Sequence, residues 1–114
     1  LLVCGDFNIA HHPIDLKNWK SNQTTSGFLP EERQWLTDFS SLGFVDVVRR
    51  LAGSETAVYS WWSQRAGSRQ RDVGWRLDYQ WASPDLAAGA TAFQIPREPV
   101  FSDHAPVVVD YQWS

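Results

Sequence analysis

Residues 74–82 carry the pattern that most constrains the fold of this chain. From position 75, every second side chain is large and apolar: Trp75, Leu77, Tyr79 and Trp81. The side chains between them, such as Asp78, are polar. Alternation with a period of two is typical of a β-strand that has one apolar and one polar face. We therefore expect a strand here, with Asp78 on its polar face.

A helix is expected to begin at Pro30. Proline suits the first helical position, and the two glutamates that follow it suit the positive end of a helix dipole. Apolar side chains then recur three to four residues apart on one face, at Trp35, Leu36 and Phe39. Gly43 is a natural stop for this helix.

Short apolar runs predict four further strands, at residues 1–4, 58–62, 90–95 and 106–113. The first of these, LLVC, is expected to be buried and to run into a polar turn at GDFN. Residues 44–51 fit either a short strand or a helical turn. Strands outnumber helices too strongly for a doubly wound nucleotide-binding fold, so the expected class is α+β.

The chain has seven tryptophans among 114 residues. A large indole buries much area, and strand alternation accounts for several of these side chains. We expect four of them to pack in the core or on a sheet: Trp35, Trp62, Trp81 and Trp113.

Composition excludes several classes of protein. A single cysteine cannot form a disulfide scaffold or a zinc site built on several cysteines. No run approaches the ~18–20 apolar residues of a membrane span, so no membrane partner is expected. The net charge of -3 gives no global sign of a dedicated nucleic-acid binder.

Three short motifs place polar groups at the ends of expected strands. They are Asp6 and Asn8 in GDFN, Asp78 within the alternating strand, and Asp103 and His104 in SDHAP. Asp6 and Asn8 are two residues apart, so they would point the same way in an extended chain and set a carboxylate beside an amide. Such a pair can orient a water molecule and hold an anionic oxygen. Each motif alone is also an ordinary polar turn.

Four motifs in one order give a stronger signal than any of them alone. GDFN, YSWW, GWRLDY and SDHAPV together resemble the C-terminal half of the endonuclease/exonuclease/phosphatase superfamily. LPEERQWL and IAHHPIDLKNWK make the chain similar to the exodeoxyribonuclease III and abasic-site endonuclease branch. The resemblance covers nearly the whole chain.

This resemblance implies half of a DNase I-like four-layer α/β sandwich with a mainly antiparallel or mixed sheet. Residues 1–114 would be the C-terminal portion of a single domain whose N-terminal half is absent, which also fits a sequence without methionine. The chain would then build about one sheet with its helix layer. The other face of that sheet would expose a large apolar patch.

The resemblance also implies roles for the polar motifs. Asp6 would act as the general base on the attacking water, and Asn8 would bind a phosphate oxygen. His104 would face the scissile phosphate, with Asp78 orienting its imidazole and favouring the protonated form. Asp103 is the candidate metal contact. Oxygen ligands suit Mg²⁺, with Mn²⁺ as a substitute.

Aromatic and basic residues have two interpretations each. Trp61, Trp75 and Leu77 match family positions that form an apolar slot for a flipped sugar without a base, but they could equally pack in the core. Arg76 could contact DNA phosphates together with arginines of the 63–73 loop, although a loop arginine more often lies in water.

The implied function is Mg²⁺-dependent hydrolysis of DNA phosphodiesters, at abasic sites and from 3′ ends, in DNA repair. The partners would be duplex DNA and the missing N-terminal half of the domain, in a cytoplasmic, nucleoid-associated location. One alternative is a phosphoinositide or sphingolipid phosphodiesterase or phosphatase of the same superfamily. Another is a catalytically silent fragment that binds DNA.

Overall fold

The computed structural model describes residues 1–65, 67–100 and 102–112. Its central sheet has three antiparallel strands in the order β1 (Leu2–Asp6), β5 (Asp78–Ala82) and β2 (Val45–Asp46). A short ladder joins β3 (Trp61–Trp62) to β4 (Gly74–Trp75), and a second ladder joins β6 (Ala90–Gln94) to β7 (Val108–Tyr111). All of these pairings are antiparallel, which agrees with the mainly antiparallel or mixed sheet that the resemblance implies.

Three α-helices and two 3₁₀ helices complete the described fold: α1 (Pro30–Ser40), α2 (Val47–Ala52), α3 (Pro84–Ala88), η1 (Pro13–Asp15) and η2 (Trp19–Asn22). The expected helix at Pro30 is confirmed. Its first turn is held by Glu32, whose Oε1 accepts hydrogen bonds from the backbone N–H groups of Gly27 and Leu29. The ambiguous 44–51 segment contains both β2 and most of α2. In the described ranges, no helix combines the length and apolar character needed to cross a bilayer.

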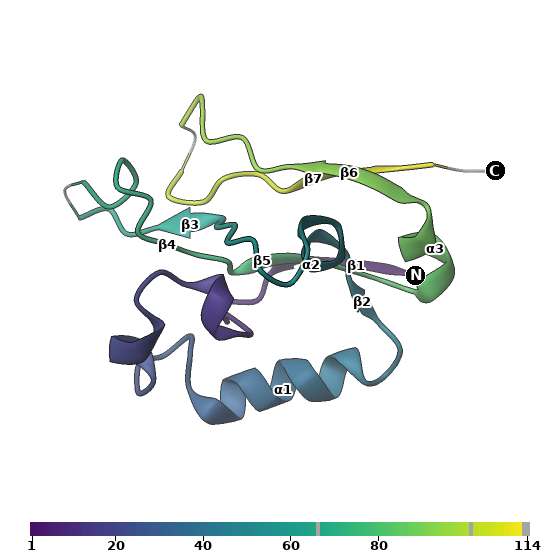
Figure 1. Cartoon of the computed structure of the whole chain (residues 1–114), viewed down its shortest axis with the longest axis horizontal. Helices are drawn as coiled ribbons and strands as arrows, with labels where there is room; N and C mark the ends of the chain where they lie inside the picture. Colours follow the sequence, from purple (N-terminus) through teal and green to yellow (C-terminus); the bar gives the residue numbers. More distant parts are fainter. Residues whose placement is uncertain (66, 101, 113–114) are drawn as a thin grey trace.

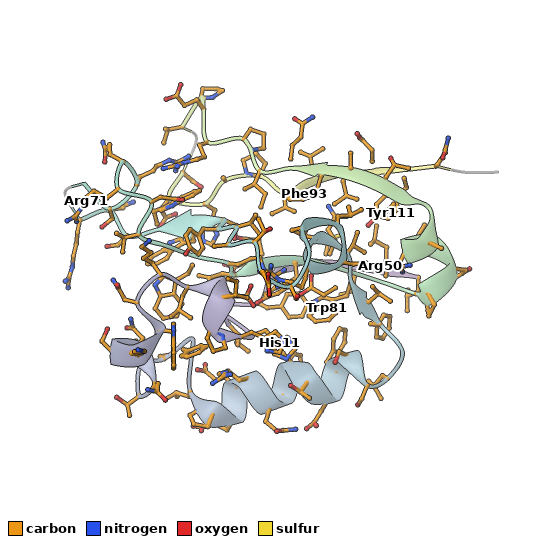
Figure 2. The ribbon with its side chains drawn as sticks, in the orientation of Figure 1. His11, Arg50, Arg71, Trp81, Phe93 and Tyr111 are labelled. Atoms are coloured by element: carbon orange, nitrogen blue, oxygen red, sulfur yellow. The ribbon has the colours of Figure 1, made fainter. Side chains whose placement is uncertain are left out.

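The elements form three layers, with α1 on one face of the central sheet and the β6–β7 hairpin on the other (Figure 1). Leu36 of α1 packs in one cluster with Tyr79 and Trp81 of β5. On the opposite face, Val109 and Tyr111 of β7 pack against a cluster that includes Ala82. In Figure 2, Trp81 lies on the helix side of the sheet, whereas Tyr111 extends from the hairpin towards it.

The hairpin layer corrects the expectation of a single sheet with one uncovered apolar face. Gln80, on the polar face of β5, donates from Nε2 to the Val107 carbonyl at 3.1 Å and accepts from the Tyr111 hydroxyl at 2.8 Å. No local sequence signal reveals this layer, because Gln80 contacts hairpin residues that lie 27 and 31 positions later. The two hydrogen bonds and the apolar cluster join the hairpin to that face of the sheet.

Two expectations about burial are wrong. Trp35 is 52% exposed, because it lies at the rim of the core, where its ring stacks on Phe39 with centroids 5.7 Å apart and lies 6.3 Å from the Phe7 ring. The LLVC strand is not buried, since β1 is an edge strand on which Leu2 is 39% exposed.

Trp62 and Trp81 are buried as expected. Trp113 lies outside the described residues, and β7 covers Val108–Tyr111 of the expected 106–113 strand.

The alternating segment is a strand in two pieces. β4 ends at Trp75 and β5 begins at Asp78, so the ladder breaks at Arg76 and Leu77. At the break, the Arg76 backbone N–H donates to the Asp15 carbonyl at 2.7 Å. The aromatic face survives this break in β5, where Tyr79 and Trp81 are buried and Asp78 is on the other face.

Candidate active site

Three polar side chains meet where β1 ends and β5 begins. Asp6, the last residue of β1, is paired in register with Asp78, the first residue of β5. His104 reaches the same place because its backbone forms a β-bridge with Trp61. The imidazole lies between the two carboxylates, with Nδ1 2.9 Å from Oδ2 of Asp78 and Nε2 3.5 Å from Oδ2 of Asp6.

These neighbours raise the pKa of His104 above its ordinary value of 6.5. Partial burial acts to lower it, but the hydrogen bond to Asp78 and the negative charges of Asp78, Asp6 and Asp103 outweigh that effect. The charged imidazolium is therefore favoured at this position. It is a donor placed at the mouth of an open site, where it can face an anion.

Asn8 returns towards Asp6 by a turn and not by an extended chain. Its φ of 55° lies in the left-handed region, which asparagine tolerates better than most residues. The Asn8 backbone N–H donates to Oδ1 of Asp6 at 2.9 Å. In the amide orientation that satisfies both side-chain atoms, its nitrogen lies 3.2 and 3.3 Å from the Asp6 carboxylate oxygens. The predicted pairing of a carboxylate with an amide is thus present.

Ser60 is a site residue that the sequence analysis missed. It is fully buried, and its hydroxyl donates to Oδ2 of Asp78 at 2.6 Å. The same hydroxyl oxygen accepts from the backbone N–H groups of Leu77 and Asp78, both at 3.1 Å. The one available signal was a small hydroxyl residue in the aromatic run YSWW.

An aromatic cavity of about 860 Å³ opens beside His104. Its apolar wall consists of Trp61, Trp75 and Leu77, the three residues predicted to form a slot. The two indoles meet edge to face, with centroids 6.3 Å apart and planes at 84°. Asn8, Asp103 and His104 also line this cavity, so apolar and polar groups converge on one space. The rest of the lining comes from the 22–27 loop and from the 63–73 segment, which contributes Arg65 and Val73.

The Asp6 and Asp78 carboxylates line a neighbouring cavity of about 430 Å³, which His104 also borders. The imidazole therefore stands between the aromatic cavity and the paired carboxylates.

Gly27 brings the 22–27 loop close to this wall. Its φ is +101°, and a Cβ built on it would lie 3.0 Å from Cζ3 of Trp75 and 3.3 Å from the Asn8 carbonyl oxygen. The loop is fixed by two hydrogen bonds, from the Gly27 N–H to Glu32 and from the Ala10 N–H to the Gly27 carbonyl. Glycine is required here both by the backbone conformation and by the close approach to Trp75.

The prediction that Arg76 contacts substrate is wrong. Its side chain is fully buried, with Nε 2.8 Å from Oδ1 of Asp15 and Nη2 2.7 Å from Oδ2 of Asp46. Asp15 is also fully buried and binds Arg49 at 2.6 Å. Burial acts to raise the pKa of Asp15, but Arg76 and Arg49 lower it below its ordinary value. A guanidinium occupied by two carboxylates inside the protein cannot reach a DNA phosphate.

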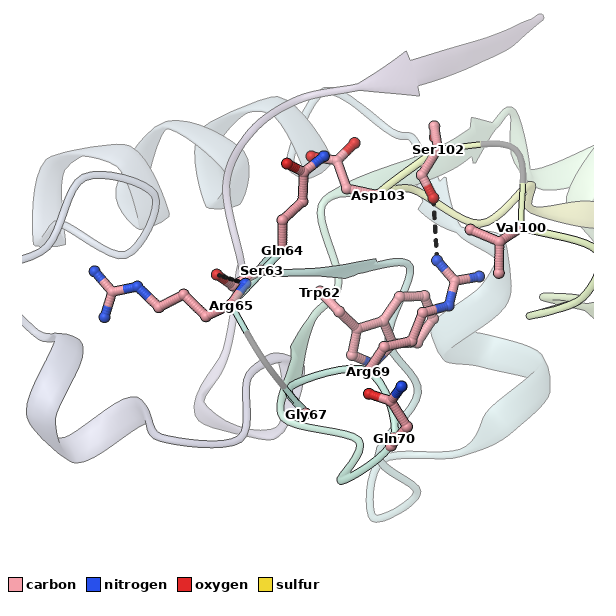
Figure 3. Close-up of a pocket in the computed structure, with 10 residues that line it drawn as sticks. All are labelled: Trp62, Ser63, Gln64, Arg65, Gly67, Arg69, Gln70, Val100, Ser102 and Asp103. Atoms are coloured by element: carbon pink, nitrogen blue, oxygen red, sulfur yellow. Dashed lines mark hydrogen bonds between the residues drawn. The ribbon is translucent and has the colours of Figure 1, made fainter.

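Asp103 lines both the aromatic cavity and a third cavity of about 450 Å³, shown in Figure 3. Its Oδ2 accepts a hydrogen bond from Nε1 of Trp61 at 3.0 Å. In Figure 3, Arg69 donates to the Ser102 carbonyl, at 3.1 Å, and its guanidinium lies over the Trp62 ring. Arg69 thus stabilises the turn that carries Asp103. Arg71, in contrast, lies exposed in the loop (Figure 2).

Asp6, Asp78 and His104 are the group with the geometry to hold a cation. One ligand atom from each lies within 4.8 Å of the others. Asp103 is not a member of this group, although it carries a carboxylate on the adjacent turn. The two carboxylates of this group, from Asp6 and Asp78, are hard oxygen ligands of the kind that suit a divalent cation with part of its water shell retained. The donor set is therefore compatible with the expected metal.

Comparison with known proteins gives a consistent result. The model of the Endonuclease/Exonuclease/phosphatase family matches residues 1–104. The chain is 44% identical to the exodeoxyribonuclease of Bacillus subtilis over 107 residues, which are 94% of this chain and 42% of that protein. It is 40% identical to the DNA repair nuclease APEX1 of Danio rerio over 109 residues, 96% of this chain and 35% of that protein.

A solved structure shares the fold. A 3′ phosphatase from Neisseria, solved bound to a product DNA hairpin, superimposes with a TM-score of 0.92 at 31% identity, over 99% of this chain and 45% of that chain. This supports the expected α+β, DNase I-like class. The chain spans less than half the length of each of these three proteins. The family match, which extends from the first residue through His104, shows that this chain belongs to the endonuclease/exonuclease/phosphatase family.

Proposed function

We propose that the protein containing this chain is a Mg²⁺-dependent phosphodiesterase that acts on duplex DNA, incising at abasic sites and trimming 3′ ends. The observation that best supports this proposal is the position of His104, between the Asp6 and Asp78 carboxylates and at the edge of an aromatic cavity. Residues 1–114 would be the C-terminal portion of one domain, completed by an N-terminal half. A cytoplasmic, nucleoid-associated location is part of this proposal.

Asp6, Asn8 and His104 would each have a separate role in the hydrolysis. Asp6 accepts the proton of the attacking water, and the Asn8 amide donates to a non-bridging phosphate oxygen. His104 donates a charge-assisted hydrogen bond to the same phosphate while Asp78 holds its other ring nitrogen. Mg²⁺, held by Asp103 and by oxygen ligands from the rest of the domain, would supply Lewis-acid stabilisation of the phosphate charge.

The aromatic cavity supports the choice of an abasic nucleotide. A deoxyribose that has lost its base is neither paired nor stacked, so its extrusion from the duplex costs little. Trp61, Trp75 and Leu77 offer an apolar surface for the sugar, directly beside the polar groups that would meet its phosphate. Among the described residues that line this cavity, the cationic groups are Arg65 and the His104 imidazolium, fewer than a headgroup with several charged phosphates would require.

The test is incision of a duplex with one abasic site by the full-length protein, in Mg²⁺ and in EDTA, with Asp6→Asn and His104→Ala as variants. We expect metal-dependent incision that falls by at least about 100-fold in both variants. Asp110→Asn, a change at an exposed carboxylate of β7, is the matched control. Incision that persists in both variants would refute the assignment. Binding without turnover would favour the silent DNA-binding alternative, and hydrolysis of a phosphoinositide alone would favour the lipid alternative.

A further inference from the structure

We propose that Trp61 is a positioning residue with two separable tasks: its indole N–H orients the Asp103 carboxylate, while its ring forms a wall of the aromatic cavity. One side chain would thereby link the seating of the sugar to the orientation of the candidate metal ligand. This inference deepens the proposed function and rests on it.

The first task depends on a single hydrogen bond. Nε1 of Trp61 lies 3.0 Å from Oδ2 of Asp103, across 42 residues of sequence. Within the described ranges, this indole is the only hydrogen-bond donor on the Asp103 carboxylate. An indole nitrogen can donate and cannot accept, so it fixes an ionised carboxylate oxygen in place. Oδ2 then accepts from Trp61, whereas Oδ1 has both of its lone pairs available for a cation.

The backbone of the same segment is held separately. Trp61 forms a β-bridge with His104, and the Trp62 N–H donates to the Asp103 carbonyl at 3.2 Å. The Ala105 N–H donates to the Ser60 carbonyl at 2.7 Å. These bonds fix where Asp103 leaves the backbone, but the torsions of its side chain are still free. The indole supplies the remaining constraint.

The second task follows from where the ring lies. Trp61 meets Trp75 edge to face, and both line the cavity that Asp103 and His104 also line. A sugar seated against the Trp61 ring would therefore press on the side chain that holds Asp103. Groups that orient metal ligands in this way commonly change metal affinity or activity by about 10- to 100-fold when they are removed.

Trp62 provides a matched control on the same strand. Its Nε1 donates to Oδ1 of Asp72 at 2.9 Å, so it too is an indole bound to an aspartate. It borders the cavity of Figure 3 and does not line the aromatic cavity. Trp62→Phe removes the same type of hydrogen bond from β3 without touching the Asp103 carboxylate.

The experiment compares Trp61→Phe, Trp61→Ala and Trp62→Phe in the full-length protein. Four quantities are measured: kcat and KM on the abasic duplex, the Kd for that duplex in EDTA, and the Kd for Mn²⁺ by electron paramagnetic resonance. In Trp61→Phe, which keeps an aromatic wall, we expect duplex affinity in EDTA within about twofold of wild type. We expect kcat and Mn²⁺ affinity each to fall about tenfold.

The other variants sharpen the interpretation. Trp61→Ala should weaken duplex binding as well, and Asp103→Asn should cost less in the Trp61→Phe background than in wild type, because the two residues act as a unit. Mn²⁺ affinity in Trp61→Phe that equals wild type or Trp62→Phe would overturn the proposal. If the wild-type protein neither binds nor cleaves the duplex, the proposed function fails, while the Mn²⁺ titration still decides whether Trp61 orients Asp103.

Discussion

The Ser60 hydroxyl and the Asp78 carboxylate form the shortest hydrogen bond around His104, 2.6 Å from oxygen to oxygen. The accepting oxygen, Oδ2, is the same one that meets Nδ1 of His104 at 2.9 Å. The Ser60 hydroxyl also accepts from the backbone N–H groups of Leu77 and Asp78, so its proton and both of its lone pairs are used at these two residues. A buried serine thus fixes the carboxylate that fixes the histidine.

Replacing Ser60 by alanine should reduce both stability and turnover. The Leu77 and Asp78 N–H groups would lose their acceptor, at a cost of about 1–3 kcal/mol in the free energy of unfolding. We expect kcat on the abasic duplex to fall about tenfold as Asp78 becomes less well oriented. Urea denaturation and steady-state kinetics test this, with the exposed Ser54→Ala as control. Wild-type kcat in Ser60→Ala would contradict the positioning role.

Replacing Asp78 by asparagine should be more damaging to turnover. The amide is nearly isosteric, but it carries no charge to stabilise the His104 imidazolium and can present its N–H₂ to the ring. We expect kcat to fall on the order of 100-fold, with KM little changed. Asp85→Asn, at an exposed carboxylate of α3, controls for the loss of one negative charge. A variant within twofold of wild type would exclude Asp78 from the machinery.

The pocket wall can be tested at Gly27. Gly27→Ala should raise KM several-fold, because the new Cβ would meet the Trp75 ring at 3.0 Å and displace it. Gly43→Ala is the matched control, since its φ of +106° is similar but a Cβ there meets no heavy atom of the described residues within 4 Å. Both variants should lose about 1 kcal/mol of stability from backbone strain. Equal KM values in the two variants would show that the contact with Trp75 is unimportant.

The buried ion cluster makes a prediction about stability. Arg76→Met leaves Asp15 and Asp46 without their shared partner, and a buried carboxylate that loses its cation costs about 3–5 kcal/mol. Unfolding by urea should show this loss, whereas Arg71→Met, at an exposed guanidinium, should change stability by less than about 0.5 kcal/mol. A loss below 1 kcal/mol in Arg76→Met would contradict the structural role assigned to the cluster.

Stability should also fall as the solution becomes acidic, in part through His11. Burial, with repulsion from His12 as a smaller cause, lowers the pKa of His11 from 6.5 to about 4. The unfolded chain therefore binds a proton below pH 6.5 that the folded chain does not bind until about pH 4. The contribution of His11 is complete above pH 6.5 and is lost as pH falls towards 4.

The matching experiment compares wild type with His11→Gln by urea denaturation at pH 7.5 and pH 5. The drop in free energy of unfolding between the two pH values should be larger in wild type, by on the order of 1–2 kcal/mol. Groups that do not interact with His11 contribute alike to both proteins and cancel in the difference. Identical drops would show that His11 is not the responsible group.

Local signals predicted the parts of the fold that local physics decides. Pro30 and Gly43 bracket α1 because proline at a first turn and glycine after a last turn act within a few residues. The polar site was identified by resemblance across four motifs. The burial of Arg76 could not be predicted in this way. Its guanidinium is stabilised in the protein interior by Asp15, which lies 61 residues away in the sequence. Ser60 was missed for a related reason, since its role depends on Asp78, 18 residues later.

The two-residue strand β3 sends Trp61 to the aromatic cavity and Trp62 to the cavity of Figure 3, because neighbouring strand residues face opposite ways. Inserting or deleting one residue just before Trp61 would exchange the two indoles between the cavities, even if every side chain of the strand were kept. This part of the chain should therefore accept changes of residue type far more readily than changes of length. We therefore expect natural and engineered variants to keep the number of residues between Ser60 and Trp62 unchanged.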